Sequence, residues 1–391
     1  MIPSVLPTYN RAPLSFVSGE GSWLTEADGR RFLDLGAGIA VNCLGHAHPG
    51  LVAALTEQAG ALWHVSNLYR IPAQQRLADR LVELTFADTA FFTNSGTEAC
   101  ELAVKMARKY WSEKGEDRSE IVTFTGAFHG RSSAAIAAVG TEKMTKGFGP
   151  LLPGFTQVDW ADHDGVRAAI TGRTAAVLIE PVQGEGGIRP VPDQCLKGLR
   201  DLCDQTGALL IFDEVQCGVG RTGKLFAHEW AGVSPDIMMV AKGIGGGFPL
   251  GAVLATEAAA AAMTAGTHGS TYGGNPLGCA VGNAVLDEVA EPAFLDAVNR
   301  KAGLLRQKLE GLVAAHPDVF EGVRGQGLML GLKGKAPNTD VVQAGYAAGV
   351  LTVPAADNVL RLLPALNIRD EDIAEAVQRL DAAAASLTPG Q

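Results

Sequence analysis

The stretch PDIMMVAKGIGGGFPLGAVLA, residues 235–255, places one lysine, Lys242, between an apolar run and a cluster of glycines. The apolar run is typical of a buried strand, so the Lys242 amine is expected at the end of that strand. An unpaired ammonium in an apolar setting is costly, and such a group either finds a partner or loses its proton. A desolvated lysine is a nucleophile suited to forming an imine. A lysine that extends into solvent is the alternative, and this stretch alone leaves both interpretations open.

The pattern of an apolar run followed by a polar turn recurs through the chain. Such runs alternate with helical stretches, which predicts an α/β protein with a mostly parallel sheet covered by helices on both faces. Strands are predicted at the beginning of the segments 89–96, 120–130, 174–182, 208–216, 237–245 and 251–256. Helices are predicted at 50–62, 71–86, 97–115 and 193–207. Sites in such sheets lie at the carboxyl ends of the strands, where the polar residues are found here.

The pattern changes after about residue 276. One long helical stretch at 277–317 precedes short strands and a terminal helix, and the N-terminal segment 15–36 is typical of a hairpin. We therefore predict two domains. Residues 60–275 form a large α/β domain, and residues 1–59 and 276–391 together form a smaller α+β domain.

Composition excludes several classes of protein. Of the 391 residues, 47% are hydrophobic and 19% are charged, which suits a globular protein with a sizeable core. A net charge of −10 without a basic run argues against nucleic acid. The N-terminus has no apolar signal region, and no segment offers about 18 uninterrupted apolar residues. Six dispersed cysteines without a CxxC pair fit reduced thiols. We therefore expect a cytoplasmic protein without a membrane span or bound metal.

The segment FFTNSGTEA ends a strand with Ser95, Gly96 and Thr97 directly before a helix. Free N–H groups and the helix dipole at such a turn favour a phosphate group. An ordinary helix cap, with a hydroxyl residue followed by a glutamate, explains the same residues. The two interpretations are compatible.

Other strand ends carry residue types that suit an aromatic, charged ligand. Phe128 could stack on a ring and Arg131 could hold a carboxylate, although a core phenylalanine and a surface arginine explain them better when each is taken alone. Glu185 lies in a glycine-flanked loop and could be a mobile carboxylate near the site. Asp213 ends a buried run, where a carboxylate needs a cationic partner such as a protonated ring nitrogen.

Together these residues match the demands of one cofactor. An amine for an imine, a carboxylate for a ring nitrogen and a face for stacking come from Lys242, Asp213 and Phe128. The turn at 95–97 supplies a site for a phosphate. Pyridoxal 5′-phosphate, a pyridine with an aldehyde and a phosphate, is the cofactor that needs this set.

The motifs also carry a family resemblance that runs nearly end to end. The sequence resembles the class III pyridoxal-phosphate aminotransferases through the segments SNLY, FFTNSGTEA, FHGRS, EPVQGEGG, IFDEVQCGVGRTGKLFAHE, MMVAKGIGGGFPLGA, HGSTYGGNPL and RLLPALNI. Within this family it is most similar to the members that use N2-acetylornithine as amino donor. The resemblance implies pyridoxal-phosphate fold type I with a seven-stranded sheet, and a homodimer with active sites at the interface.

The resemblance implies a role for each cofactor residue. Lys242 would form the imine and then shuttle a proton, while Asp213 would keep the pyridine nitrogen protonated. Gln216 would hydrogen-bond the phenolic oxygen of the cofactor, and Phe128 would stack on its ring. The phosphate would be held by Ser95, Gly96 and Thr97, helped by Thr271 of the partner subunit.

Two arginines would recognise the substrates. Arg131, with Ser270 nearby, would bind the α-carboxylate of N2-acetylornithine, and Arg361 would pair with Glu185 while the δ-amino group reacts. When 2-oxoglutarate arrives, Glu185 would swing away so that Arg361 takes the α-carboxylate and Arg131 takes the distal one. Other ω-amino donors stay open, namely ornithine, 4-aminobutyrate, succinylornithine and N-succinyl-diaminopimelate.

Two glycine-rich segments suggest rival functions. GVGRTGKL, residues 218–225, nearly matches the phosphate-binding loop of nucleotide hydrolases, but Leu225 stands where the Mg²⁺-binding hydroxyl belongs. GIGGGF, residues 243–248, departs from the dinucleotide-binding pattern at Phe248, and a strand is expected to follow it. A non-catalytic, cofactor-binding regulator would keep Asp213 but could dispense with Lys242.

Overall fold

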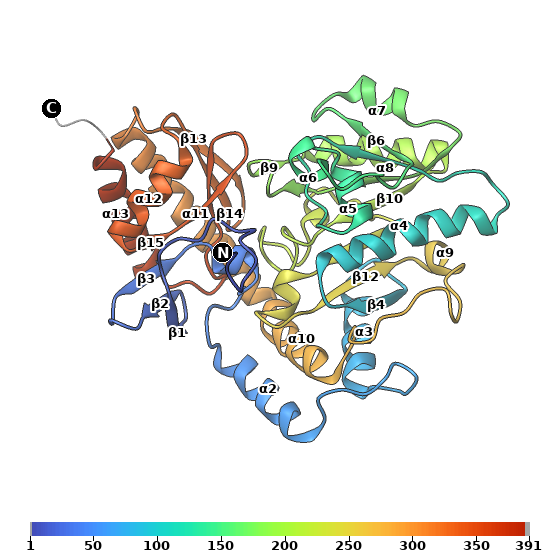
Figure 1. Ribbon diagram of the computed structural model, residues 1–391, viewed down its shortest axis with the longest axis horizontal. Coiled ribbons are helices and arrows are strands. Elements are labelled where there is room, and N and C mark those ends of the chain that lie inside the picture. The colour runs from blue at the N-terminus through green and yellow to red at the C-terminus, as the bar shows by residue number, and fades with distance from the viewer. Residues whose placement is uncertain (1, 388–391) are drawn as a thin grey trace.

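The computed structural model describes residues 2–387 and contains a central seven-stranded sheet (Figure 1). The strand order is β4-β12-β11-β10-β7-β5-β6. The strands are β4 (Thr89–Thr93), β5 (Glu120–Phe124), β6 (Phe155–Val158), β7 (Thr174–Ile179), β10 (Leu209–Asp213), β11 (Ile237–Val240) and β12 (Gly251–Ala255). β12 is antiparallel to both of its neighbours, and the other pairs are parallel. The predicted mostly parallel, seven-stranded sheet is therefore confirmed.

Helices cover both faces of this sheet. α4 (Gly96–Glu113) packs on β11 and β12, and α8 (Asp193–Thr206) packs on β10. Ile211 of β10 lies in the core under α4, whereas Leu210 and Phe212 lie in the core under α8. Successive side chains of a strand point to opposite faces, so a strand covered on both faces appears in the sequence as a continuous apolar run.

Further helices, two 3₁₀ turns and a short strand pair lie between residues 37 and 260. The helices are α1 (Ala37–Ala40), α2 (Pro49–Ala61), α3 (Pro72–Leu84), α5 (Ser133–Val139), α6 (Glu142–Thr145), α7 (His163–Ala169) and α9 (Glu257–Ala260). The 3₁₀ turns are η1 (Ala227–Trp230) and η2 (Lys242–Gly245), and the strand pair is β8 (Val182–Gln183) with β9 (Arg189–Pro190). The helices predicted at 50–62, 71–86, 97–115 and 193–207 correspond to α2, α3, α4 and α8.

Two further four-stranded sheets lie beside the large one, at the left of Figure 1. One contains β13 (Phe320–Gln326), β14 (Met329–Gly334), β17 (Val359–Leu362) and β16 (Val353–Ala355). The other joins β1 (Phe16–Glu20), β2 (Trp23–Glu26) and β3 (Arg31–Asp34) to β15 (Val350–Leu351). The N-terminal and C-terminal parts of the chain thus contribute to one sheet, because β3 pairs with β15. The domain bounds stay a prediction, and residues 1 and 388–391 lie outside the described residues.

The prediction of one long helical stretch at 277–317 was wrong. The structure has two helices, α10 (Pro276–Val289) and α11 (Pro292–Ala315). Glu291 has an extended ψ of 126° before Pro292, because a residue that precedes proline is disfavoured in the helical region. α10 packs against α2 and α3. α12 (Asn338–Ala348), which was not predicted, and the predicted terminal helix α13 (Asp370–Ala385) complete the fold.

Candidate active site

Lys242 begins η2, and one residue, Ala241, separates it from the buried strand β11. Its φ of 49° is left-handed, which is uncommon for a residue with a side chain. The pKa of the Lys242 amine is lowered mainly by burial, an effect that Glu185 opposes and Arg361 reinforces. This lowered pKa favours the interpretation of Lys242 as a nucleophile over that of a lysine extended into solvent.

Asp213 ends β10, the strand next to β11, and is 3% exposed. Its Oδ2 lies 2.7 Å from Nδ1 of His129, and its Oδ1 accepts the N–H of Val215 at 3.0 Å. Burial lowers the pKa of His129, but the hydrogen bond to Asp213 and its charge outweigh burial, so the net pKa is raised. Asp213 therefore has a buried hydrogen-bond partner inside the protein, His129, which the sequence analysis missed.

A second buried carboxylate, Glu180, was also missed. It directly follows β7, which pairs with β10, so it lies near Asp213. Burial, followed by the Asp213 charge, raises the pKa of Glu180 to about 7. Both missed residues lie inside quoted motifs, His129 in FHGRS and Glu180 in EPVQGEGG, at strand ends where a charged residue already signals a site.

The start of α4 has the geometry of a capped helix. Ser95 is its N-cap, and its Oγ accepts the N–H of Glu98 at 3.3 Å. Gly96 and Thr97 lie in the first turn, where N–H groups have no acceptor within the helix. A Cβ on Gly96 would lie 2.8 Å from Val215, so glycine is required there. The predicted cap is present, and it leaves the N–H groups of Gly96 and Thr97 available to an anion.

The Thr97 hydroxyl fixes the segment that carries Phe128 and Arg131. Its oxygen accepts the N–H groups of Arg131 at 3.1 Å and Ser132 at 3.0 Å. The guanidinium carbon of Arg131 lies 5.7 Å from the centre of the Phe128 ring. Arg131 is exposed and Phe128 is partly buried, so a ligand can reach both side chains.

Arg361 lies on β17 and is 2% exposed. Its Nη1 donates to Oε1 of Glu185 at 2.6 Å, and its Nη2 donates to Oε2 at 3.1 Å. The predicted ion pair of Arg361 and Glu185 is thus present. Nη1 also donates to Oε1 of Gln216 at 3.2 Å. The oxygen of Gln216 is therefore engaged by Arg361, and its amide nitrogen is the atom left to donate to a ligand.

Ser270 and Thr271 lie on the loop that precedes α10. Oγ of Ser270 accepts the N–H of Gly273 at 2.9 Å and lies 3.4 Å from the amide nitrogen of Asn94. Within residues 2–387, Ser270 and Arg131 form no hydrogen bond with each other, and the role of Ser270 near Arg131 at the substrate stays a prediction. Thr271 is exposed, and its role toward another subunit stays a prediction.

The assembled residues fit pyridoxal phosphate. A buried carboxylate suits a protonated ring nitrogen, and the carboxylate of Asp213 lies 2.7 Å from Nδ1 of His129. Among the described residues, 2–387, Nε2 of His129 is buried and has no hydrogen-bond partner, so it is an atom that a bound group or a water could satisfy. The amine of Lys242 and the free N–H groups at the start of α4 match the aldehyde and the phosphate.

Comparison with known sequences decides the family. The sequence model of the family described as aminotransferase class-III matches residues 6–384. The chain belongs to the class III aminotransferases. A relative named acetylornithine aminotransferase from Rhodobacter capsulatus is 76% identical over 99% of both chains. One of the same name from Mesorhizobium japonicum is 62% identical over 97% of this chain and 96% of the relative.

Solved structures agree with this aminotransferase family. The N-acetylornithine aminotransferase from Stenotrophomonas maltophilia has a TM-score of 0.85 at 41% identity and 97% coverage of both chains. The ornithine aminotransferase from Toxoplasma gondii, described with partial occupancy of pyridoxal phosphate, has a TM-score of 0.93 at 30% identity, covering 98% of this chain and 92% of that one. This class III aminotransferase therefore has pyridoxal-phosphate fold type I, and pyridoxal phosphate is its cofactor.

The rival interpretations do not fit the aminotransferase fold. The segment 218–225 leads into the 3₁₀ turn η1, whereas a nucleotide-binding loop leads into an α-helix. The segment 243–248 leads into the strand β12, as expected. In the part of the chain that the structure describes, no helix is long and apolar enough to cross a membrane.

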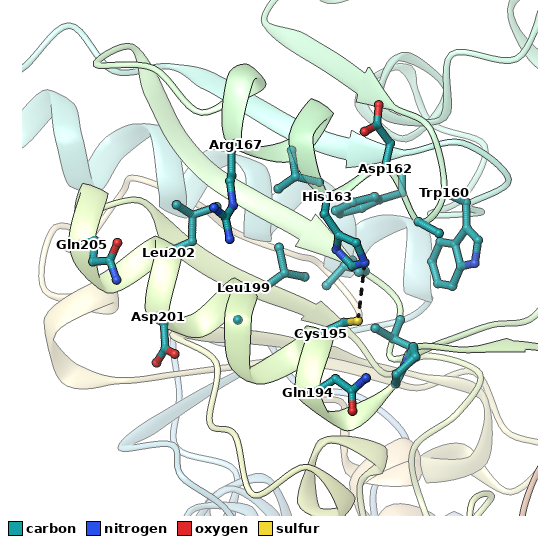
Figure 2. A pocket seen from close by; sticks show the side chains of 17 residues that line it. Trp160, Asp162, His163, Arg167, Gln194, Cys195, Leu199, Asp201, Leu202 and Gln205 are labelled. Carbon is teal, nitrogen blue, oxygen red and sulfur yellow. Dashed lines mark hydrogen bonds between the residues drawn. The ribbon is translucent and has the colours of Figure 1, made fainter.

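A separate cavity of about 740 Å³ lies between α7 and α8 (Figure 2). Its lining includes Trp160, His163 and Cys195, and Sγ of Cys195 lies 4.0 Å from Nε2 of His163. None of the predicted site residues lines this cavity. It is therefore distinct from the candidate active site of the aminotransferase.

Proposed function

We propose that this aminotransferase transfers the δ-amino group of N2-acetyl-L-ornithine to 2-oxoglutarate, giving N-acetyl-L-glutamate 5-semialdehyde and L-glutamate. The observation that carries the proposal is the ion pair of Arg361 and Glu185 beside Gln216. A buried arginine masked by a partly exposed carboxylate suits an enzyme whose two substrates differ in charge next to the reacting group. Relatives named acetylornithine aminotransferase at 76% and 62% identity support the choice of donor.

When bound, pyridoxal phosphate supplies an electron sink for the negative charge that develops at the carbon bearing the amino group. Asp213 would hold the proton on the ring nitrogen, because a neighbouring carboxylate favours the protonated form. His129 keeps Asp213 in place through its hydrogen bond of 2.7 Å. Nζ of Lys242, with its lowered pKa, would remove the proton from the reacting carbon and later return a proton.

Two charged side chains would orient the substrates. Arg131 is exposed beside the Phe128 ring and would hold the α-carboxylate of N2-acetylornithine. Glu185 would stay on Arg361 while the δ-amino group reacts, because this donor has no carboxylate next to its reacting amine. When 2-oxoglutarate binds, the Glu185 side chain would turn away and Arg361 would take the α-carboxylate.

Replacing Glu185 with alanine is expected to raise the preference for α-amino acids over ω-amines by about tenfold. The reason is that Arg361 becomes permanently available, and a charge-assisted hydrogen bond contributes about 1.5–3 kcal/mol. The measurement is kcat/KM for L-glutamate against kcat/KM for N2-acetylornithine. Asp370→Ala is the control, since Asp370 forms a comparable but exposed pair with Arg300 at 2.8 Å. A ratio that is the same in Glu185→Ala and wild type would refute the masking role.

The amino donor is tested by comparing kcat/KM for N2-acetylornithine, ornithine, 4-aminobutyrate, succinylornithine and N-succinyl-diaminopimelate. We expect N2-acetylornithine to give the highest value. Succinylated donors are expected next, because they too are N-acylated α-amino acids with a distal amine. A preference for ornithine or 4-aminobutyrate would make this chain a different ω-aminotransferase of the same family.

A homodimer with the active sites at its interface is also part of the proposal. Asn67 donates to the carbonyl groups of Ser270 at 3.1 Å and Gly273 at 2.9 Å, which ties the loop after α2 to the loop that carries Thr271. These loops expose large apolar side chains, namely Leu62, Trp63, Leu68, Tyr69 and Tyr272, each at least 48% exposed. Such a cluster is typical of a protein–protein interface.

Replacing Leu68 with glutamate is expected to convert the dimer into a monomer. Leu68 is 88% exposed, so the substitution costs the single chain little, whereas a buried, unpaired charge would oppose association. Sedimentation velocity measures the mass, and we expect aminotransferase activity to fall with the dimer because Thr271 of the partner subunit would be lost from the site. A wild-type chain that sediments as a monomer and is fully active would contradict the proposal.

We also place the enzyme in the cytoplasm. All six cysteines are free, which suits a reducing compartment.

A further inference from the structure

Glu180 lies between the segment that carries Phe128 and the loop that carries Glu185. It is 4% exposed. Its Oε1 accepts the backbone N–H of Phe128 at 2.9 Å, and its Oε2 accepts the backbone N–H of Gly184 at 3.1 Å. One buried carboxylate thus bridges the peptide of the ring-stacking residue and the peptide that precedes the masking glutamate.

The loop on the Gly184 side has little freedom. A Cβ on Gly184 would lie 2.4 Å from the Gln216 amide, so the backbone is packed directly against that side chain. The carbonyl of Gly184 accepts the N–H of Gly187 at 3.3 Å, and the carbonyl of Glu185 accepts the N–H of Ala356 at 3.0 Å. The backbone of Glu185 is therefore held on both sides, and its side chain is the part that can rotate.

The chemistry of a carboxylate suits this bridge. A glutamate has two acceptor atoms for two N–H donors, whereas a glutamine would turn an N–H₂ group toward one of them. The carboxylate is also costly at this place, because it is buried near the like-charged Asp213. A buried charged group that is costly to hold near a site is a candidate for a functional role, and the two contacts of Glu180 lead to two residues of the proposed mechanism.

We propose that Glu180 is a positioning residue for the choice of amino donor. By holding the peptides of Phe128 and Gly184, it keeps the stacking ring and the Glu185 carboxylate in a fixed relative position, so that Glu185 masks and releases Arg361 by side-chain rotation alone. The effect of Glu180 on donor choice rests on the proposed function, in which Glu185 masks Arg361. The bridge itself does not depend on which donor is used.

The test compares Glu180→Gln with the wild-type holoenzyme by two measurements. Hydrogen exchange is expected to become at least about tenfold faster in the peptide that covers 126–130 or in the one that covers 182–188, because the N–H that faces the glutamine NH₂ group loses its acceptor and the bridge opens. The ratio of kcat/KM for N2-acetylornithine to kcat/KM for L-glutamate is expected to fall at least about threefold, because Glu185 masks Arg361 less well. If Glu180→Gln does not fold, Glu180→Asp keeps the charge but is too short for both contacts, and the same changes are expected.

Glu214→Gln is the matched control. Glu214 is fully buried and also accepts two backbone N–H groups, from Ala227 at 2.7 Å and His228 at 2.8 Å, but on a different loop. The Glu214→Gln variant should speed hydrogen exchange at 226–230. It should leave the ratio of kcat/KM for N2-acetylornithine to kcat/KM for L-glutamate unchanged.

The two measurements separate the possible failures. Exchange that stays slow in both segments of the Glu180→Gln variant overturns the bridge. Faster exchange with an unchanged donor ratio overturns the role in donor choice and leaves Glu180 structural. The exchange measurement needs no substrate, so it tests the bridge whichever amino donor the enzyme uses. If the proposed donor is wrong, the wild-type enzyme itself will show low kcat/KM for N2-acetylornithine, and this outcome differs from both results above.

Discussion

Replacing Lys242 with alanine is expected to lower kcat/KM for the amino donor by about 10⁴-fold or more. A positioned proton-transfer group contributes about 10²- to 10⁴-fold, and the same amine is also the nucleophile that would bond the cofactor. Burial lowers the pKa of Lys242, so a larger fraction of the amine is neutral and reactive than in an exposed lysine. Steady-state kinetics with N2-acetylornithine and 2-oxoglutarate measure the loss.

A second lysine provides the control for this variant. Lys224 belongs to the segment that resembles a nucleotide-binding loop, is exposed, and lies 5.3 Å from the centre of the Trp230 ring. Lys224→Ala should retain wild-type activity. Small primary amines added to Lys242→Ala should restore part of the rate, because they can replace the missing base in the space left by the side chain. Near-normal activity of Lys242→Ala without added amine would contradict the assignment.

The sequence was sufficient for the central strands of the large sheet, such as β7, β10 and β11, because these strands are buried on both faces. A run such as 209–213 is apolar at every position before its terminal aspartate, which distinguishes it from a half-exposed strand. The break between α10 and α11 was missed because α10 is itself apolar nearly all round and gives a weak periodic signal before Pro292. β6 and α12 were missed because they are short or carry few apolar residues in a regular pattern.

The candidate site was predictable where one strand end carries one chemical group. Lys242, Asp213 and Glu185 are of this kind, because each stands out against an apolar run or a glycine-rich loop. His129 and Glu180 also lie in motifs at strand ends, but their contacts could not be predicted, because these depend on β5, β7 and β10 being neighbours in the sheet. Strand order is set by packing across the whole domain, and the local sequence does not encode it.

Replacing Asp213 with asparagine is expected to lower kcat by about 10²- to 10³-fold, the range found when one electrostatic partner of a transition state is removed. Asparagine has nearly the same shape and can still accept a hydrogen bond from His129, so the fold should be retained. It carries no charge, however, and a carboxylate is what would keep the ring nitrogen of the cofactor protonated. Kinetics of the amino-donor half-reaction measure the loss.

The control for Asp213→Asn must separate lost charge from lost packing. Asp236 lies just before the neighbouring strand β11, at the end of the strands opposite to Asp213. It accepts the N–H of Leu210 at 2.7 Å and pairs with Arg200 at 2.8 Å. Asp236→Asn removes a comparable charge, so it should lower the melting temperature and leave kcat unchanged. If both variants lost kcat equally, the effect would come from the sheet as a whole. If Asp213→Asn kept kcat, the negative charge at the end of β10 would not be needed for catalysis, and the buried pair of Asp213 and His129 would be structural.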